Sequence, residues 1–204
     1  MKAFLASSPS LNETQTSELL RLVGKDKADK VLVITAAVVP YGLSPRPEWV
    51  DLQLEPLKAI SGEMVETTLE DGDFMPADLS QYDFIFVSGG NTFYLAYCLQ
   101  KTGWDKKIIE YMHNGGVYSG SSAGSIILMD NIEHFSPADD PTKAPEVCSG
   151  LNLIKEAVIP HADSEKYGEL MKGIAENYRK DGYAIISLDD DKVCVIDGEQ
   201  KKII

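Results

Sequence analysis

Apolar residues follow two alternating patterns along this chain: short continuous runs, and longer segments with helical spacing. Continuous runs of strand length are typical of parallel strands buried on both faces. The runs that we interpret as strands occupy residues 2–6, 30–36, 64–69, 83–88, 117–120 and 157–160. The segments with helical spacing occupy residues 16–23, 47–60, 91–100, 105–113, 122–129 and 164–179. Strands that alternate with helices predict a mainly parallel sheet with helices on both faces.

The last third of the chain has a different pattern. Residues 130–150 form an acidic, proline-containing stretch that we expect to be a loop. Acidic and Asp-Gly turns then separate apolar segments, which predicts short antiparallel strands at 184–188, 193–196 and 201–204. The expected fold class is α/β, a three-layer, doubly wound, mainly parallel sheet with a short C-terminal antiparallel hairpin. In such sheets, sites form beyond the carboxyl ends of the strands.

Length and charge limit the classes of function. A chain of 204 residues suits one domain, taken as residues 1–204. Its net charge of −13 repels phosphate backbones and anionic lipid, so we expect no nucleic-acid or membrane partner. The chain starts without a signal-peptide pattern, and its apolar runs are shorter than the ~20 residues that cross a bilayer. Its three cysteines have no CxxC spacing, so we expect a reducing, cytoplasmic location.

A glycine-rich turn, GSSAG at residues 120–124, lies between an expected strand and an expected helix. Gly-x-Ser-x-Gly in that context is the nucleophile-elbow pattern, which presents a serine hydroxyl at the mouth of a site. The serine would be Ser122, and the amide of Ala123 could stabilise an oxyanion. The alternative interpretations are a structural Gly/Ser turn and a phosphate-cradling loop.

A second strand-to-helix turn, SGGNT, occupies residues 88–92. Its paired glycines permit positive φ angles and close approach by a substrate, and their amides could supply a second oxyanion donor. The alternative is an ordinary glycine-rich turn in which Asn91 or Thr92 caps the following helix.

A serine nucleophile needs a general base, and the chain has three histidines. His113 lies at the end of an expected helix, where a structural role is favoured, and His134 lies in a charged loop. His161 directly follows the strand expected at 157–160, at the end where sites form. His161 is therefore the best candidate. Spacing does not choose the carboxylate that would orient it, since candidates occur at Asp139, Asp140, Asp163, Asp189, Asp190 and Asp191.

Three segments, SGGNTF at 88–93, GSSAGS at 120–125 and PH at 160–161, occur in an order that resembles peptidase E and cyanophycinase, the serine peptidases of family S51. The resemblance covers most of the chain. It implies a fold like that of class I glutamine amidotransferases, with serine where those enzymes carry cysteine, so we expect no glutaminase activity.

The resemblance also assigns roles to residues. It implies Ser122 as the nucleophile, His161 as the general base, and the backbone of Gly90 and Ala123 as the oxyanion hole. From the second glycine-rich turn we expect substrate contacts at Gly89, Asn91 and Thr92.

The third catalytic residue has two candidates, of which we favour Asp190. The register of the final hairpin places Asp190 where the family has an acidic residue, usually Glu, while an older family assignment points to a position near Asp140. Shortening Glu to Asp withdraws the carboxylate by about one C–C bond, which would weaken its hydrogen bond to His161 unless the backbone moves.

Substrate specificity follows the family less closely. The family peptidase removes an N-terminal aspartate, and the arginine of a Gly-Glu-Thr-Arg segment pairs with the aspartate carboxylate. This chain reads GELMK at 168–172, so the arginine is absent from its register and Lys172 comes one position late. A lysine cannot reproduce the two-pronged contact of arginine.

The expected function is that of a serine exopeptidase or dipeptidase that hydrolyses a short peptide, with N-terminal Asp as one candidate substrate. No His/Cys/Glu cluster has ligand spacing, so we expect no metal and no cofactor. We expect a monomer or a homodimer. The alternatives are a cyanophycinase-like hydrolase of aspartyl-arginine peptides and a non-catalytic relative that binds peptides.

Overall fold

A computed structural model describes residues 1–8, 11–70, 73–146 and 148–204. Its main sheet has seven strands in the order β3-β2-β4-β5-β1-β8-β9, and β6 and β7 form a separate two-stranded sheet. The strands are β1 (Lys2–Ala6), β2 (Ala28–Ile34), β3 (Ser61–Thr67), β4 (Phe84–Val87), β5 (Val117–Ser121), β6 (Ala157–Ile159), β7 (Ile185–Ser187), β8 (Val193–Asp197) and β9 (Gln200–Ile203). The α-helices are α1 (Glu13–Val23), α2 (Glu48–Ile60), α3 (Thr92–Thr102), α4 (Trp104–His113), α5 (Ala123–Ile126) and α6 (Gly168–Lys180). Three 3₁₀ turns are η1 (Ala36–Tyr41), η2 (Glu133–Phe135) and η3 (Pro141–Lys143).

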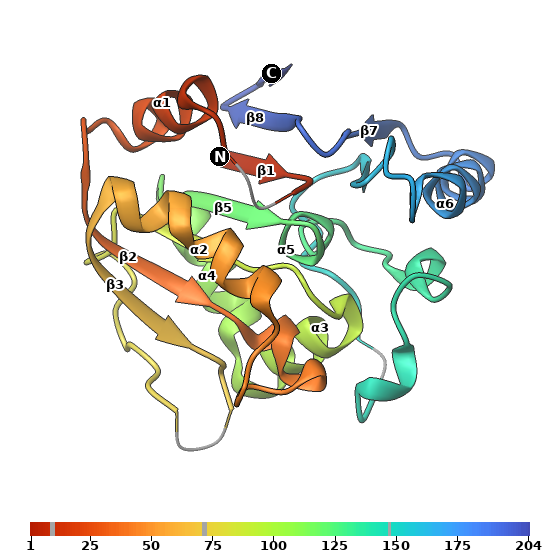
Figure 1. The fold of residues 1–204 in the computed structure, drawn as a ribbon, viewed down its shortest axis with the longest axis horizontal. Coiled ribbons are helices and arrows are strands. Elements are labelled where there is room, and N and C mark those ends of the chain that lie inside the picture. The colour runs from red at the N-terminus through yellow and green to blue at the C-terminus, as the bar shows by residue number, and fades with distance from the viewer. Residues whose placement is uncertain (9–10, 71–72, 147) are drawn as a thin grey trace.

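Helices cover both faces of the main sheet, because alternate residues of each strand point to opposite sides. In β2, Val31 and Val33 pack with α1 and α2, while Leu32 and Ile34 pack with α3 and α4. Figure 1 shows α2 in front of the sheet and α4 behind it. The three-layer α/β fold is therefore confirmed. Within the described part of the chain, no helix has the length and apolar character to cross a membrane.

The C-terminal strands are only partly as expected. β8 runs antiparallel to β1 and to β9, which confirms the hairpin. The expectation that residues 184–188 join this antiparallel set is wrong, since β7 pairs in parallel with β6. The physical reason is α6, which connects the two strands and returns the chain to the same end, so that they run in one direction. Figure 1 shows β7 and α6 on the side toward which β1 and β5 point.

Two helices are shorter than expected. The helix expected at 122–129 is α-helical only over α5, because the returning segment takes its last carbonyls: Leu151 N–H donates to Ile127 O and Leu153 N–H donates to Leu128 O, both at 2.8 Å. The helix expected from Ser164 begins at Gly168. Ser164 instead lies in the preceding turn, where its hydroxyl accepts a hydrogen bond from Tyr167 N–H.

Candidate active site

Ser122 lies in a sharp turn between β5 and α5. Its φ of 48° and ψ of −111° are a conformation that non-glycine residues rarely adopt. The flanking glycines explain how the turn fits. A Cβ on Gly120 would lie 2.3 Å from the carbonyl oxygen of Gly124, and one on Gly124 would lie 2.1 Å from that of Val87. Only glycine permits this packing, and strained serines of this kind cluster at functional sites.

His161 follows β6 and faces Ser122. Its Nε2 lies 3.0 Å from Ser122 Oγ, and its Nδ1 lies 2.6 Å from Asp190 Oδ1. A carboxylate accepts only, so Nδ1 carries the proton and Nε2 is left to accept from the serine hydroxyl. His161 also has a positive φ, 57°. The structure thus brings together three residues that are far apart in the sequence, in the order nucleophile, base and carboxylate.

Asp190 reaches His161 although it is shorter than glutamate. Its backbone N–H donates to Asp163 Oδ1 at 2.8 Å, and Leu188 N–H donates to Ile159 O at 2.9 Å, which ties the turn after β7 to the end of β6. The weakened contact expected for the shorter side chain is therefore not observed, because the backbone places Asp190 close to the imidazole.

Ser7 is a site residue that the sequence did not reveal. Its hydroxyl accepts from the backbone N–H of His161 at 2.6 Å and donates to Asp190 Oδ1 at 3.2 Å. Ser7 follows β1, the strand that pairs with β5. The sequence feature that could have indicated it is a small polar residue at the end of the strand that neighbours the one before Ser122.

Asp140 lies outside this arrangement. It is exposed, and its carboxylate accepts from the N–H and hydroxyl of Thr142 at 2.9 and 2.7 Å, which lowers its pKa. The other two histidines are also elsewhere. His113 ends α4, and His134 pairs with Asp181 at 2.6 Å.

Two backbone amides near Ser122 have no hydrogen-bond acceptor in the described part of the chain, those of Gly90 and Ala123. The amide of Gly89 is already used, since it donates to Gln53 Oε1 at 2.8 Å. Gly90 has a φ of 139°, and a Cβ there would lie 2.2 Å from the carbonyl oxygen of Ala37. The turn therefore requires glycine and keeps one amide free for a ligand.

Asn91 and Thr92 are buried and do not line the cavity beside Ser122. Asn91 caps α3 through its side chain and donates to Asp140 O, while Thr92 N–H donates to Asp139 Oδ2 at 2.9 Å. Both residues join the start of α3 to the loop at 130–150. The substrate contacts expected from them remain predictions.

A cavity of about 350 Å³ opens over Ser122. Apolar and aromatic side chains that the sequence did not single out form much of its wall, since they come from segments distant from the glycine-rich turns. Its lining residues are Ser7, Tyr41, Trp49, Gln53, Gly89, Gly90, Ser121, Ser122, Ile126, Phe135, Ala138, Asp139, His161, Tyr167 and Met171.

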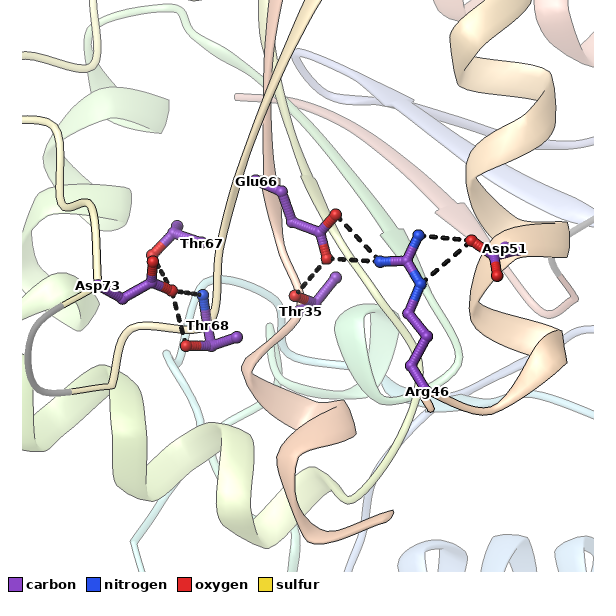
Figure 2. Close-up of polar contacts among 7 residues, drawn as sticks. All are labelled: Thr35, Arg46, Asp51, Glu66, Thr67, Thr68 and Asp73. Carbon is purple, nitrogen blue, oxygen red and sulfur yellow. Dashed lines mark hydrogen bonds and ion pairs between the residues drawn. The ribbon is translucent and has the colours of Figure 1, made fainter. Parts of the chain in front are cut away.

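Tyr41 and Trp49 form one wall of this cavity. Arg46, which lies between them in the sequence, forms ion pairs with β3 and α2 (Figure 2). Its Nη1 donates to both carboxylate oxygens of Glu66 on β3 at 2.9 and 3.1 Å, and its Nε donates to Asp51 Oδ1 on α2 at 3.1 Å. The segment so fixed lies between Tyr41 and Trp49, whose rings meet edge to face. A separate group in the same view joins Asp73 to Thr67 and Thr68.

We expect the Arg46→Ala variant to loosen this wall. Removing partly exposed ion pairs should lower stability by about 1 kcal/mol, a fall in Tm of about 2–4 °C. The chain has two tryptophans and Trp104 is fully buried, so acrylamide quenching reports on Trp49 and should increase. Arg46→Lys keeps the charge without the two-pronged geometry and should give a smaller increase. Unchanged quenching in Arg46→Ala would show that these ion pairs do not position the wall.

Among the described residues, no group of three or more His, Cys, Asp or Glu side chains could hold a metal ion.

A serine elbow beside a histidine and a carboxylate, at the edge of an α/β sheet, defines a class of candidate serine hydrolases. Residues 4–204 match the model of peptidase family S51, and the chain therefore belongs to that family. The resemblance drawn from the sequence motifs is therefore confirmed, and the family is one of peptidases, as the sequence predicts.

Individual relatives agree with this membership. The chain is 36% identical over 118 residues to an uncharacterized peptidase of Listeria innocua, which covers 57% of this chain and 56% of that protein. It is 29% identical over 137 residues to peptidase E of Streptomyces coelicolor, covering 67% and 55% of the two chains. The chain thus spans about half the length of the curated relatives that it matches. A crystal structure from Listeria monocytogenes, assigned provisionally as a peptidase E, shares the fold with a TM-score of 0.80 and 24% identity, covering 100% of this chain and 97% of that one.

Proposed function

We propose that the protein is a serine exopeptidase or dipeptidase that hydrolyses short peptides through an acyl-enzyme on Ser122. One observation carries the proposal, the continuous hydrogen-bonded chain from Ser122 Oγ through His161 to Asp190 at the wall of a cavity. A nucleophile with an adjacent base, itself oriented by a third group, is the arrangement that activates a serine.

The reaction follows from these positions. His161 Nε2 accepts the proton of Ser122 Oγ as the oxygen attacks the peptide carbonyl carbon, and Asp190 stabilises the imidazolium that forms. The free amides of Gly90 and Ala123 receive the oxyanion. The imidazolium then donates its proton to the leaving amine as the C–N bond breaks, which leaves the acyl group on Ser122. A water molecule, deprotonated by His161, releases the acid and restores the serine.

The size of the cavity supports a short substrate. About 350 Å³ lies at the lower end of the range for small-molecule pockets, about 300–1,000 Å³. The rings of Tyr41 and Trp49 line this cavity and offer apolar surface to the side chains of a bound peptide.

Labelling with a fluorophosphonate probe followed by peptide mapping tests the proposal. We expect a single adduct on the peptide that contains Ser122, and cleavage of members of a dipeptide library by the same preparation. A folded protein that takes no label and cleaves no dipeptide would contradict the proposal and leave a peptide-binding relative as the interpretation.

A further inference from the structure

The cavity over Ser122 has no positively charged lysine or arginine side chain among its described lining residues, although the chain resembles a peptidase that removes N-terminal aspartate. Among the described residues that line it, none is lysine or arginine, and the one carboxylate is that of Asp139. The family arginine would fall at position 171, where this chain has a buried methionine that lines the cavity. The group expected to receive an acidic side chain is thus replaced by an apolar one.

Lys172 and Arg46 do not compensate for this loss. Lys172 is largely exposed and pairs with Glu169 on the outside of α6. The guanidinium of Arg46 is bound by Asp51 and Glu66 (Figure 2). Neither residue lines the cavity.

Asp139 lines this cavity. Its Oδ2 accepts from Thr92 N–H at 2.9 Å, and no lysine or arginine is among the groups that shift the pKa of its carboxyl. Burial raises this pKa, as expected for a carboxyl group withdrawn from water. The side chain is close enough to His161 for the two to interact electrostatically. A carboxylate in this state gains from a cation that enters the cavity.

We propose that Asp139 is a specificity-determining residue that binds a cationic nitrogen of the substrate, either its α-ammonium group or a basic side chain, and that the cavity disfavours acidic side chains. The inference rests on the proposed function, because it assigns a substrate class to the same site. A hydrogen bond between a cationic N–H group and a carboxylate is stronger than one between neutral groups, and burial away from water strengthens it further. An acidic side chain in the same place would face Asp139, and the described residues that line the cavity include no lysine or arginine to offset the repulsion.

A purely structural role for Asp139 is the competing interpretation, since its bond to Thr92 N–H attaches the loop at 130–150 to α3. Asp139→Asn separates the two roles. The asparagine side-chain oxygen can still accept from Thr92 N–H, while the negative charge is lost. Glu133→Gln is the matched control, because it removes one negative charge from the same loop at an exposed position that does not line the cavity.

The test is calorimetric binding to a Ser122→Ala background, which separates recognition from chemistry. The probes are Leu-Leu, Asp-Leu, N-acetyl-Leu-Leu and N-acetyl-Lys-Leu. If Asp139 binds the α-ammonium group, Asp139→Asn should weaken Leu-Leu by about 10- to 100-fold, the range for hydrogen bonds to charged groups, and leave N-acetyl-Leu-Leu unchanged. If it binds a basic side chain, the same loss should appear for N-acetyl-Lys-Leu. With Asp139 intact, Asp-Leu should bind more weakly than Leu-Leu. Glu133→Gln should alter none of these affinities.

Three results would overturn the inference: equal affinities with Asp and Asn at position 139, an equal loss for N-acetyl-Leu-Leu, or no binding of any of the four peptides. Failure of the proposed function would have a different signature, an absence of probe labelling and hydrolysis in the protein with Ser122 intact. Charge-dependent binding without labelling would retain the role of Asp139 and remove the catalytic one.

Discussion

The Ser122→Ala variant should lose peptide hydrolysis by about a millionfold in kcat, the scale seen when the nucleophile of a serine protease is removed. The reason is that the hydroxyl whose oxygen would form the acyl-enzyme is gone, while the cavity is unchanged. Serine and alanine both carry a Cβ, so the backbone strain at a φ of 48° should be similar in the two proteins, and the free energy of unfolding should change little. The measurements are kcat on the dipeptide that is cleaved best, and fluorophosphonate labelling, which should disappear.

Ser119→Ala is the matched control for this change. Ser119 lies in β5, three positions before Ser122, and is buried outside the cavity. The same hydroxyl group is removed, here from the strand that precedes Ser122, so labelling and kcat should remain close to those of the unaltered protein. Equal labelling of Ser122→Ala and the unaltered protein would show that another residue is the nucleophile.

The second large effect is expected at Asp190. Asp190→Asn should lower kcat by about 10³- to 10⁴-fold, because the amide can donate to the imidazole and favour the tautomer whose Nε2 carries the proton. Such a histidine cannot accept from Ser122. Thermal unfolding of the variant checks that the turn after β7 is retained, since the backbone bond from residue 190 to Asp163 does not depend on the carboxylate.

Asp140→Asn distinguishes the two carboxylates that the sequence left open. The Asp140 side chain is bonded to Thr142 on the exposed side of the loop, and asparagine can accept from the same amide. Its kcat should therefore change less than twofold, within the usual effect of a surface substitution. A large loss in Asp140→Asn with full activity in Asp190→Asn would reverse the assignment.

The parts of the site that could be predicted from sequence are those fixed by local structure. Ser122 and Gly90 lie in turns whose glycines are required by contacts with backbone a few residues or one strand away, so a short motif carries the information. Asp190 could be chosen only through the family resemblance, because many acidic turns look alike. Ser7 was not assigned a role, and Asp139 was only one of several candidate carboxylates, since the position of each relative to His161 depends on which distant elements meet.

The fold shows the same division. Buried apolar runs predicted the parallel strands, because burial on both faces leaves a direct mark on composition. The length of α5 and the partner of β7 were missed. Hydrogen bonds from residues 151–153 determine where α5 ends. The direction of β7 is determined by its pairing with β6, which lies on the other side of α6 in the sequence. Neither contact leaves a periodic pattern in the segment concerned.

The division of the site between two sheets has a consequence for how such a protein can change over evolution. Ser122 and the free amides of Gly90 and Ala123 extend from the seven-stranded sheet, while His161 and Asp190 extend from the β6–β7 sheet, with Ser7 joining the two groups. The groups proposed for anion binding and those proposed for proton transfer therefore have separate supports. Substitutions in the smaller sheet can remove the proton-transfer residues and leave the cradle for a carbonyl oxygen intact. Catalysis and recognition can thus be lost independently, and a relative without activity can still bind the peptides that its ancestor cleaved.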